Sequence, residues 1–201
     1  MVMTLIPTLG FIPLFAISIT TLHIPTILAG ILLGVKGGAI VGLSFGFMSF
    51  LNATFRPTLL SFMFSPFAPA PVDFGGNPLS LVVAFVPRIL LGIIAGIMYQ
   101  FMTKKGWEIT LSKEKGLKLG AATLTAVIAA FIHTAMVLGL WILIFASPLE
   151  VALNLDGFGG VLAFTGGIIT SNALFEAALA GVLMTGFVLA LQPIVKKMVN
   201  N

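Results

Sequence analysis

The chain has 201 residues, of which 59% are hydrophobic and only 8% are charged. A soluble domain carries about 25% charged residues, so this composition predicts an integral membrane protein with a single domain, residues 1–201. The formal charge is +4, but the sequence has no basic patch interleaved with aromatic residues. The lack of such a patch argues against a nucleic-acid partner. The absence of cysteine excludes disulfides, thiolate metal sites and a cysteine nucleophile.

The first part of the chain is predicted to hold the end of one helix and a short second helix. Residues 1–22 are apolar but interrupted by Pro7, Gly10 and Pro13, which predicts a helix end followed by a loop over the outer face. We expect the start of this first helix to be missing from the sequence. A second apolar run, residues 24–34, rises only about 16 Å as a helix, roughly half of a bilayer core.

The rest of the chain alternates between long apolar runs and breaks. Four further helices are predicted, at residues 38–54, 79–102, 117–145 and 171–195. The breaks are a loop rich in Phe, Pro and Ser, a polar stretch and a Gly-rich loop, at residues 55–78, 103–116 and 147–170. The sequence therefore predicts an all-α membrane bundle with a short second helix and long outer loops.

The basic residues predict the orientation of this bundle. The lysines fall in breaks between apolar runs or near the C-terminus, and the densest group lies in residues 103–118. Positively charged loops are retained on the cytoplasmic side, so we expect the 103–118 loop and the C-terminus to be cytoplasmic. The two arginines, Arg56 and Arg88, lie toward the opposite face. The preference of basic residues for cytoplasmic loops does not explain these two arginines. Each therefore needs a partner for its positive charge, and an anionic ligand is one candidate.

Glycines recur at spacings of four, as in Gly38, Gly42 and Gly46, and again in Gly92 and Gly96. Small residues at this spacing let helix backbones approach closely in lipid. The favoured interpretation is tight packing within one bundle. The alternative is a docking face for a partner membrane subunit.

Polar side chains collect in the outer half of the predicted bundle. Asn52, Asn172 and Glu176 join the arginines there, and the last two share a helix face because they are four residues apart. Ionisable groups in a membrane are costly and usually face a cavity or one another. Either Arg88 and Glu176 form an ion pair that only holds the bundle together, or Arg88 binds a carboxylate or phosphate in an outward pocket. In such a pocket, Asn172 and Glu176 would bind hydroxyl or amide groups.

Two further residues are candidates for ligand contact. His133 lies near the middle of its span, where a lone histidine makes either a helix–helix hydrogen bond or a ligand contact. Phe64 belongs to an amphipathic loop, residues 61–67, which either lies at the membrane interface or folds over the pocket as a lid.

No enzyme motif is present: there is no Walker loop, no HExxH and no GxSxG. A membrane enzyme acting on lipid headgroups, with His133 and Glu176 as acid and base, is the least favoured hypothesis because no nucleophile or metal site accompanies them. The chain is therefore predicted to be a binding protein and not an enzyme. Without a nucleotide site it cannot drive uptake by itself.

Several sequence blocks resemble a known family. The blocks are HIPTILAGILLG from His23, KGGAIVG from Lys36, FGFMSF from Phe45, Ser65-Pro66-Phe67, Val86-Pro87-Arg88, and Thr170-Ser171-Asn172 with Glu176. Together they extend over most of the chain and are similar to S-components, the substrate-binding membrane subunits of bacterial energy-coupling factor (ECF) vitamin transporters. The loop block most resembles the pantothenate-specific type.

The resemblance implies a six-transmembrane-helix bundle in the cell membrane that binds a vitamin from outside. It also implies docking onto a transmembrane coupling (T) subunit and two ATPase subunits, which use ATP, so that this chain holds no cofactor. S-components typically carry an Ala-x-x-x-Ala motif in the first helix that contacts the coupling subunit. No residue of this sequence can be assigned to that motif.

An acidic vitamin suits the candidate residues best. The carboxylate of pantothenate would bind Arg88 or Arg56. Its hydroxyls and amide would bind Asn172, Glu176 and Asn52. Folate also carries carboxylates, whereas riboflavin and hydroxymethylpyrimidine carry no anion and would leave the arginines unexplained. A structural membrane protein without a ligand is the alternative from a different class.

Overall fold

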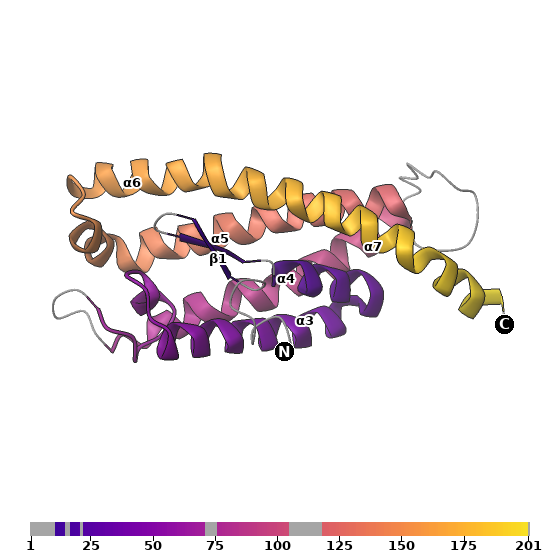
Figure 1. The fold of residues 1–201 in the computed structure, drawn as a ribbon, viewed down its shortest axis with the longest axis horizontal. Coiled ribbons are helices and arrows are strands. Elements are labelled where there is room, and N and C mark those ends of the chain that lie inside the picture. Colours follow the sequence, from indigo (N-terminus) through magenta and orange to yellow (C-terminus); the bar gives the residue numbers. More distant parts are fainter. Residues whose placement is uncertain (1–10, 15–16, 21, 71–75, 105–117, 201) are drawn as a thin grey trace.

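The computed structural model describes residues 11–14, 17–20, 22–70, 76–104 and 118–200. The elements in chain order are β1 (Phe11–Leu14), β2 (Ile17–Thr20), α3 (His23–Phe55), the 3-10 turn η1 (Ser61–Met63), α4 (Leu79–Lys104), α5 (Leu119–Leu153), α6 (Gly157–Ile168), the π turn η3 (Ile169–Ala173) and α7 (Leu174–Asn200). The helices form one elongated bundle (Figure 1). Within the described residues, four helices are long and apolar enough to span a membrane: His23–Phe55, Leu79–Thr103, Leu119–Leu153 and Gly157–Leu191. The predicted helical, multi-pass membrane protein is thereby confirmed.

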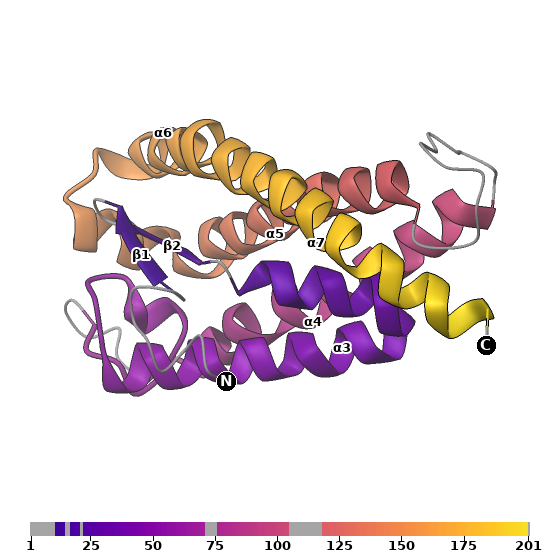
Figure 2. The same ribbon diagram turned by 45° about the vertical axis from the view of Figure 1, so that its right-hand side comes forward.

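Helix α3 folds back on itself at Gly34. This glycine has φ +73°, which residues with a side chain rarely adopt, and it divides α3 into a short arm (23–33) and a long arm (35–55). The two arms run in opposite directions from a bend at one end of the bundle (Figure 2). The short helix predicted for residues 24–34 is confirmed. Because it is too short to cross a bilayer, the neighbouring helices have to cover its end.

Glycines hold α3 and α4 in close contact. A Cβ atom on Gly38 would come closer than 3.0 Å to the backbone oxygen of Gly92, and one on Gly42 would come closer than 3.0 Å to that of Arg88. A Cβ atom on Gly30, in the short arm, would also come closer than 3.0 Å to the backbone oxygen of Gly92. Backbones approach this closely only where side chains are absent. The favoured interpretation of the glycine ladder, packing within one bundle, is therefore confirmed for these residues.

Residues 147–170 are mainly helical, and the prediction of a Gly-rich loop there is wrong. Helix α5 ends in a turn at Asn154 (φ +50°), α6 begins at Gly157, and α6 continues through η3 into α7. Glycine weakens a helix, but an unpaired backbone group in lipid costs more than the lost helix propensity, so the segment stays helical. Asn172 and Glu176 consequently lie within one long helix and not at its start.

The N-terminal part also differs from the prediction. Strands β1 and β2 pair in antiparallel fashion where the sequence predicts a loop; their Phe, Ile and Thr residues favour strands. The helix end predicted within residues 1–10 lies outside the described residues. The count of six transmembrane helices is not confirmed, because the described part of the chain holds four candidate spans and the two arms of α3 form one of them.

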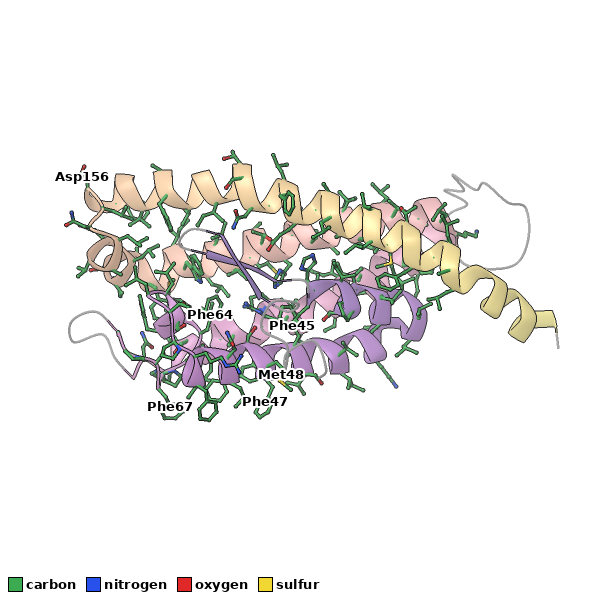
Figure 3. All side chains as sticks on the ribbon, in the orientation of Figure 1. Phe45, Phe47, Met48, Phe64, Phe67 and Asp156 are labelled. Carbon is green, nitrogen blue, oxygen red and sulfur yellow. The ribbon has the colours of Figure 1, made fainter. Side chains whose placement is uncertain are left out.

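Charged residues divide between the two ends of the bundle. Lys36 lies near the bend of α3, α4 ends at Lys104 and Lys118 precedes α5; we call this end the lysine end (Figure 2). Asp156, between α5 and α6, lies at the opposite end, which we call the loop end (Figure 3). The loop with η1 lies at the loop end as well (Figure 1).

Candidate functional site

A cavity of about 150 Å³ lies between α3, α4, α5 and the α6–α7 helix, below the loop that carries η1. A cavity of this size is large enough for an organic molecule and not only for a water molecule. Its polar lining consists of Ser49, Asn52, Thr58, Ser61, Arg88, His133, Thr134, Asn172 and Glu176. Its apolar lining consists of Ala53, Leu60, Phe64, Val137, Leu138, Trp141 and Ile168.

The structure brings most of the predicted binding residues together. Six of the seven line the cavity: Asn52, Phe64, Arg88, His133, Asn172 and Glu176. The seventh, Arg56, is exposed at the C-terminal end of α3 and is not among the lining residues. The two arginines therefore differ in environment, although the sequence placed both near the same face.

Arg88 is the central charge of the cavity. It is only 5% exposed, and its guanidinium carbon lies 4.8 Å from the ring centre of Phe64 and 5.5 Å from that of Phe45. Such cation–π contacts are strongest where water is excluded. Its Nη1 donates a hydrogen bond of 2.5 Å to the backbone oxygen of Val83. The protein thus fixes one side of the guanidinium and stacks two aromatic rings against it.

Three cavity-lining residues each have a buried side-chain nitrogen without a hydrogen-bond partner among the described residues. The three nitrogens are Nε of Arg88, Nε2 of His133 and Nε1 of Trp141. More than nine-tenths of buried polar groups in proteins are hydrogen-bonded, so three exceptions around one cavity indicate a missing partner. At least two of them, the guanidinium and the indole, are donors only. The cavity is therefore suited to a ligand that carries several acceptor oxygens.

The opposite wall supplies acceptors. Thr134 on α5 donates a hydrogen bond of 2.9 Å to the carboxylate of Glu176 on the α6–α7 helix. Glu176 is also near enough to Arg88 for its negative charge to stabilise the guanidinium. A ligand in this cavity would meet donors from α4 and α5, and acceptors from Glu176 and the amide oxygens of Asn52 and Asn172.

Sequence reasoning missed part of the α5 wall. Trp141 follows His133 by eight residues, and Val137 lies between them at the helical spacing of four, so all three share one face. The Trp141 ring stands edge-on to Phe64, with ring centres 5.8 Å apart. The spacing of four from His133 shows that these residues share its helix face, but their place at the cavity comes only from the structure.

A multi-pass helical bundle with a buried cavity that is lined by polar and apolar side chains and contains an arginine defines a membrane protein that binds a small polar molecule. The model of the family "ECF transporter, substrate-specific component" matches residues 1–190. The chain therefore belongs to this family.

Two relatives share much of the sequence. The chain is similar to the pantothenic acid transporter PanT of Lactococcus lactis subsp. cremoris, with 35% identity over 177 residues that cover 88% of this chain and 79% of the relative. It is also similar to the pantothenate transporter PanT of Leuconostoc mesenteroides subsp. mesenteroides, with 28% identity over 200 residues that cover 96% of this chain and 86% of the relative. Both relatives are named as transporters, which points away from an enzyme.

Proposed function

We propose that this chain binds pantothenate from outside the cell as the substrate-specific component of an ECF transporter. The observation that carries the proposal is the buried guanidinium of Arg88, a cavity-lining residue whose Nε has no hydrogen-bond partner among the described residues. A buried cation of this kind selects a ligand with a carboxylate. The names of both relatives point to the same acidic vitamin.

The lining suits the rest of the pantothenate molecule. Its hydroxyls and amide both donate and accept hydrogen bonds, and Glu176, Asn172 and Asn52 offer matching groups. Riboflavin and hydroxymethylpyrimidine carry no anion, so they would leave Arg88 buried without a counter-charge from the ligand. A purely structural role is less favoured, because it leaves the nitrogens of Arg88 and His133 unexplained.

Transport by this chain requires partners. Within the proposal, a transmembrane T subunit and two ATPase subunits dock onto the chain, and ATP is hydrolysed on those partners. The chain itself holds no cofactor and contributes specificity alone. Isolated chain in detergent should therefore bind the vitamin without moving it.

Tryptophan fluorescence offers a direct test, because Trp141 lines the cavity. Pantothenate is expected to change the emission of the purified chain, and panthenol, in which a hydroxymethyl group replaces the carboxylate, is expected to bind roughly 100-fold more weakly. Folate, riboflavin and hydroxymethylpyrimidine serve as competitors in the same titration. Equal affinity for pantothenate and panthenol would rule out recognition of the carboxylate, and binding of another vitamin alone would reassign the substrate.

Orientation within the membrane is a separate prediction: the lysine end faces the cytoplasm. The chain has no cysteine, so a single introduced cysteine is a specific reporter. A membrane-impermeant maleimide is expected to label Asp156→Cys in intact cells and to label Lys36→Cys only after permeabilisation. The reverse pattern would place the cavity on the cytoplasmic side and contradict uptake from outside.

A further inference from the structure

We propose that Pro87 is a positioning residue that acts through Arg88. Because Pro87 has no backbone N–H, the backbone oxygen of Val83 is available to the guanidinium of Arg88. The bond to this oxygen orients the guanidinium toward the ligand. The inference rests on the proposed function, since it concerns the same anion site.

The spacing along α4 carries the first step. In an α-helix the N–H of residue i bonds the oxygen of residue i−4, and Val83 is the residue four before Pro87. Pro87 lies within α4 (Leu79–Lys104) and has no N–H to offer. The oxygen of Val83 therefore lacks its usual partner, which is costly inside a membrane. Arg88 supplies the substitute, because its Nη1 donates to this oxygen at 2.5 Å.

The same bond fixes the guanidinium. Arg88 is buried, and its backbone is held against α3 at Gly42, where there is no room for a Cβ atom. The rings of Phe64 and Phe45 lie at 4.8 and 5.5 Å from the guanidinium carbon. With Nη1 bound to the oxygen of Val83 and the two rings beside the guanidinium, rotation of the planar fork is restricted, and Arg88 is held as one of the cavity-lining residues. An arginine that is fixed before binding loses less conformational entropy when the ligand arrives.

A residue with an N–H at position 87 would change this arrangement. Its N–H would donate to the oxygen of Val83 along the helix axis, as in any α-turn. A carbonyl oxygen has two lone pairs, so the oxygen of Val83 would then be shared between this N–H and the guanidinium. The hydrogen bond from the guanidinium would be weakened but not abolished. A proline in a helix interior is unfavourable relative to alanine. Pro87 therefore lowers the stability of α4 while it keeps the guanidinium of Arg88 oriented.

The test is Pro87→Ala in the purified full chain, with pantothenate as the probe. We expect the dissociation constant to increase roughly three- to tenfold, the range set by freeing one long side chain. The ligand-free thermal midpoint should rise or stay unchanged, because the helix regains a hydrogen bond. Affinity and stability should thus change in opposite directions.

Two comparisons separate positioning from a general structural role. In an Arg88→Met background, Pro87→Ala should produce no further loss of affinity, because the residue through which Pro87 acts is gone. Pro148→Ala removes the proline inside α5, which is not among the cavity-lining residues, and should leave affinity for pantothenate unchanged.

The outcomes are distinguishable. Unchanged affinity of Pro87→Ala, or an equal loss with and without Arg88, would overturn the inference while leaving the proposed function intact. If the parent chain does not bind pantothenate, the proposed function fails, and the inference fails with it.

Discussion

Arg88→Met is expected to weaken pantothenate binding by roughly 100-fold or more without unfolding the protein. The guanidinium is the cation that would meet the carboxylate, and loss of one partner of a buried charged hydrogen bond costs about 2–5 kcal/mol. Methionine fills a similar volume and replaces the cation–π contacts with Phe64 and Phe45 by sulfur–aromatic contacts. Titration by tryptophan fluorescence or calorimetry gives the change in affinity directly.

Stability is the second measurement on this variant. Removing a buried cation removes its desolvation cost, and this gain offsets part of the lost bond to the oxygen of Val83 and of the lost attraction to Glu176. The ligand-free thermal midpoint is therefore expected to fall while the chain stays folded. In the parent, saturating pantothenate should raise the midpoint through its binding to the folded state, and this shift should be nearly absent in the variant.

Arg56→Met is the matched control for this experiment. It makes the same change at an arginine that is exposed and lies outside the cavity lining. Its affinity for pantothenate should equal that of the parent. If Arg88→Met bound pantothenate normally, or if Arg56→Met lost binding to the same degree, the assignment of the carboxylate to Arg88 would be wrong.

The contrast between the two arginines shows what sequence reasoning can and cannot place. The sequence predicted that Arg88 belongs to a cluster of polar residues between the spans, and the structure places it buried in α4 at the cavity. The sequence put Arg56 near the same face, but it could not tell that this side chain follows the last turn of α3 and is exposed. Which face of a helix end points inward depends on tertiary packing, and a linear pattern contains this information only weakly.

The glycine-rich stretch after residue 146 illustrates a different limit. In water a glycine-rich segment favours a loop, whereas in a membrane the need to pair backbone groups favours a helix. The structure shows helix there, so that Asn172 and Glu176 sit midway along a long helix. Their common face was predicted correctly from the spacing of four, because this relation holds wherever the helix begins. Relations between residues within one helix were therefore more reliable than helix boundaries.

Trp141 was missed because apolar spacing does not separate a core residue from a cavity residue. Only the combination of burial, at 4% exposure, with an Nε1 that has no partner among the described residues identifies it as part of the site. The sequence can show that Trp141 shares a face with His133. It cannot show that this face borders a cavity.

Gly42→Ala is expected to destabilise the folded bundle strongly. An added Cβ would meet the backbone oxygen and carbon of Arg88 and the Cα of Ile89, all closer than 3.0 Å. These are backbone atoms on α4 and cannot move away as a flexible side chain would. Overpacking of this kind costs roughly 3 kcal/mol or more where neither backbone can relax. We expect a markedly lower thermal midpoint, measured in detergent without ligand.

Gly139→Ala makes the same substitution within α5 at a glycine where an added Cβ would meet no atom within 4 Å. It should leave the midpoint unchanged or raise it slightly, because alanine favours the helix by about 1 kcal/mol. If both variants kept the parental stability, the close approach of α3 and α4 would not be required for folding. Because the contact point of Gly42 is Arg88 itself, the surviving folded fraction should also bind pantothenate more weakly than Gly139→Ala does. Gly42 would then both allow the close packing of α3 and α4 and determine the position of Arg88 in the cavity.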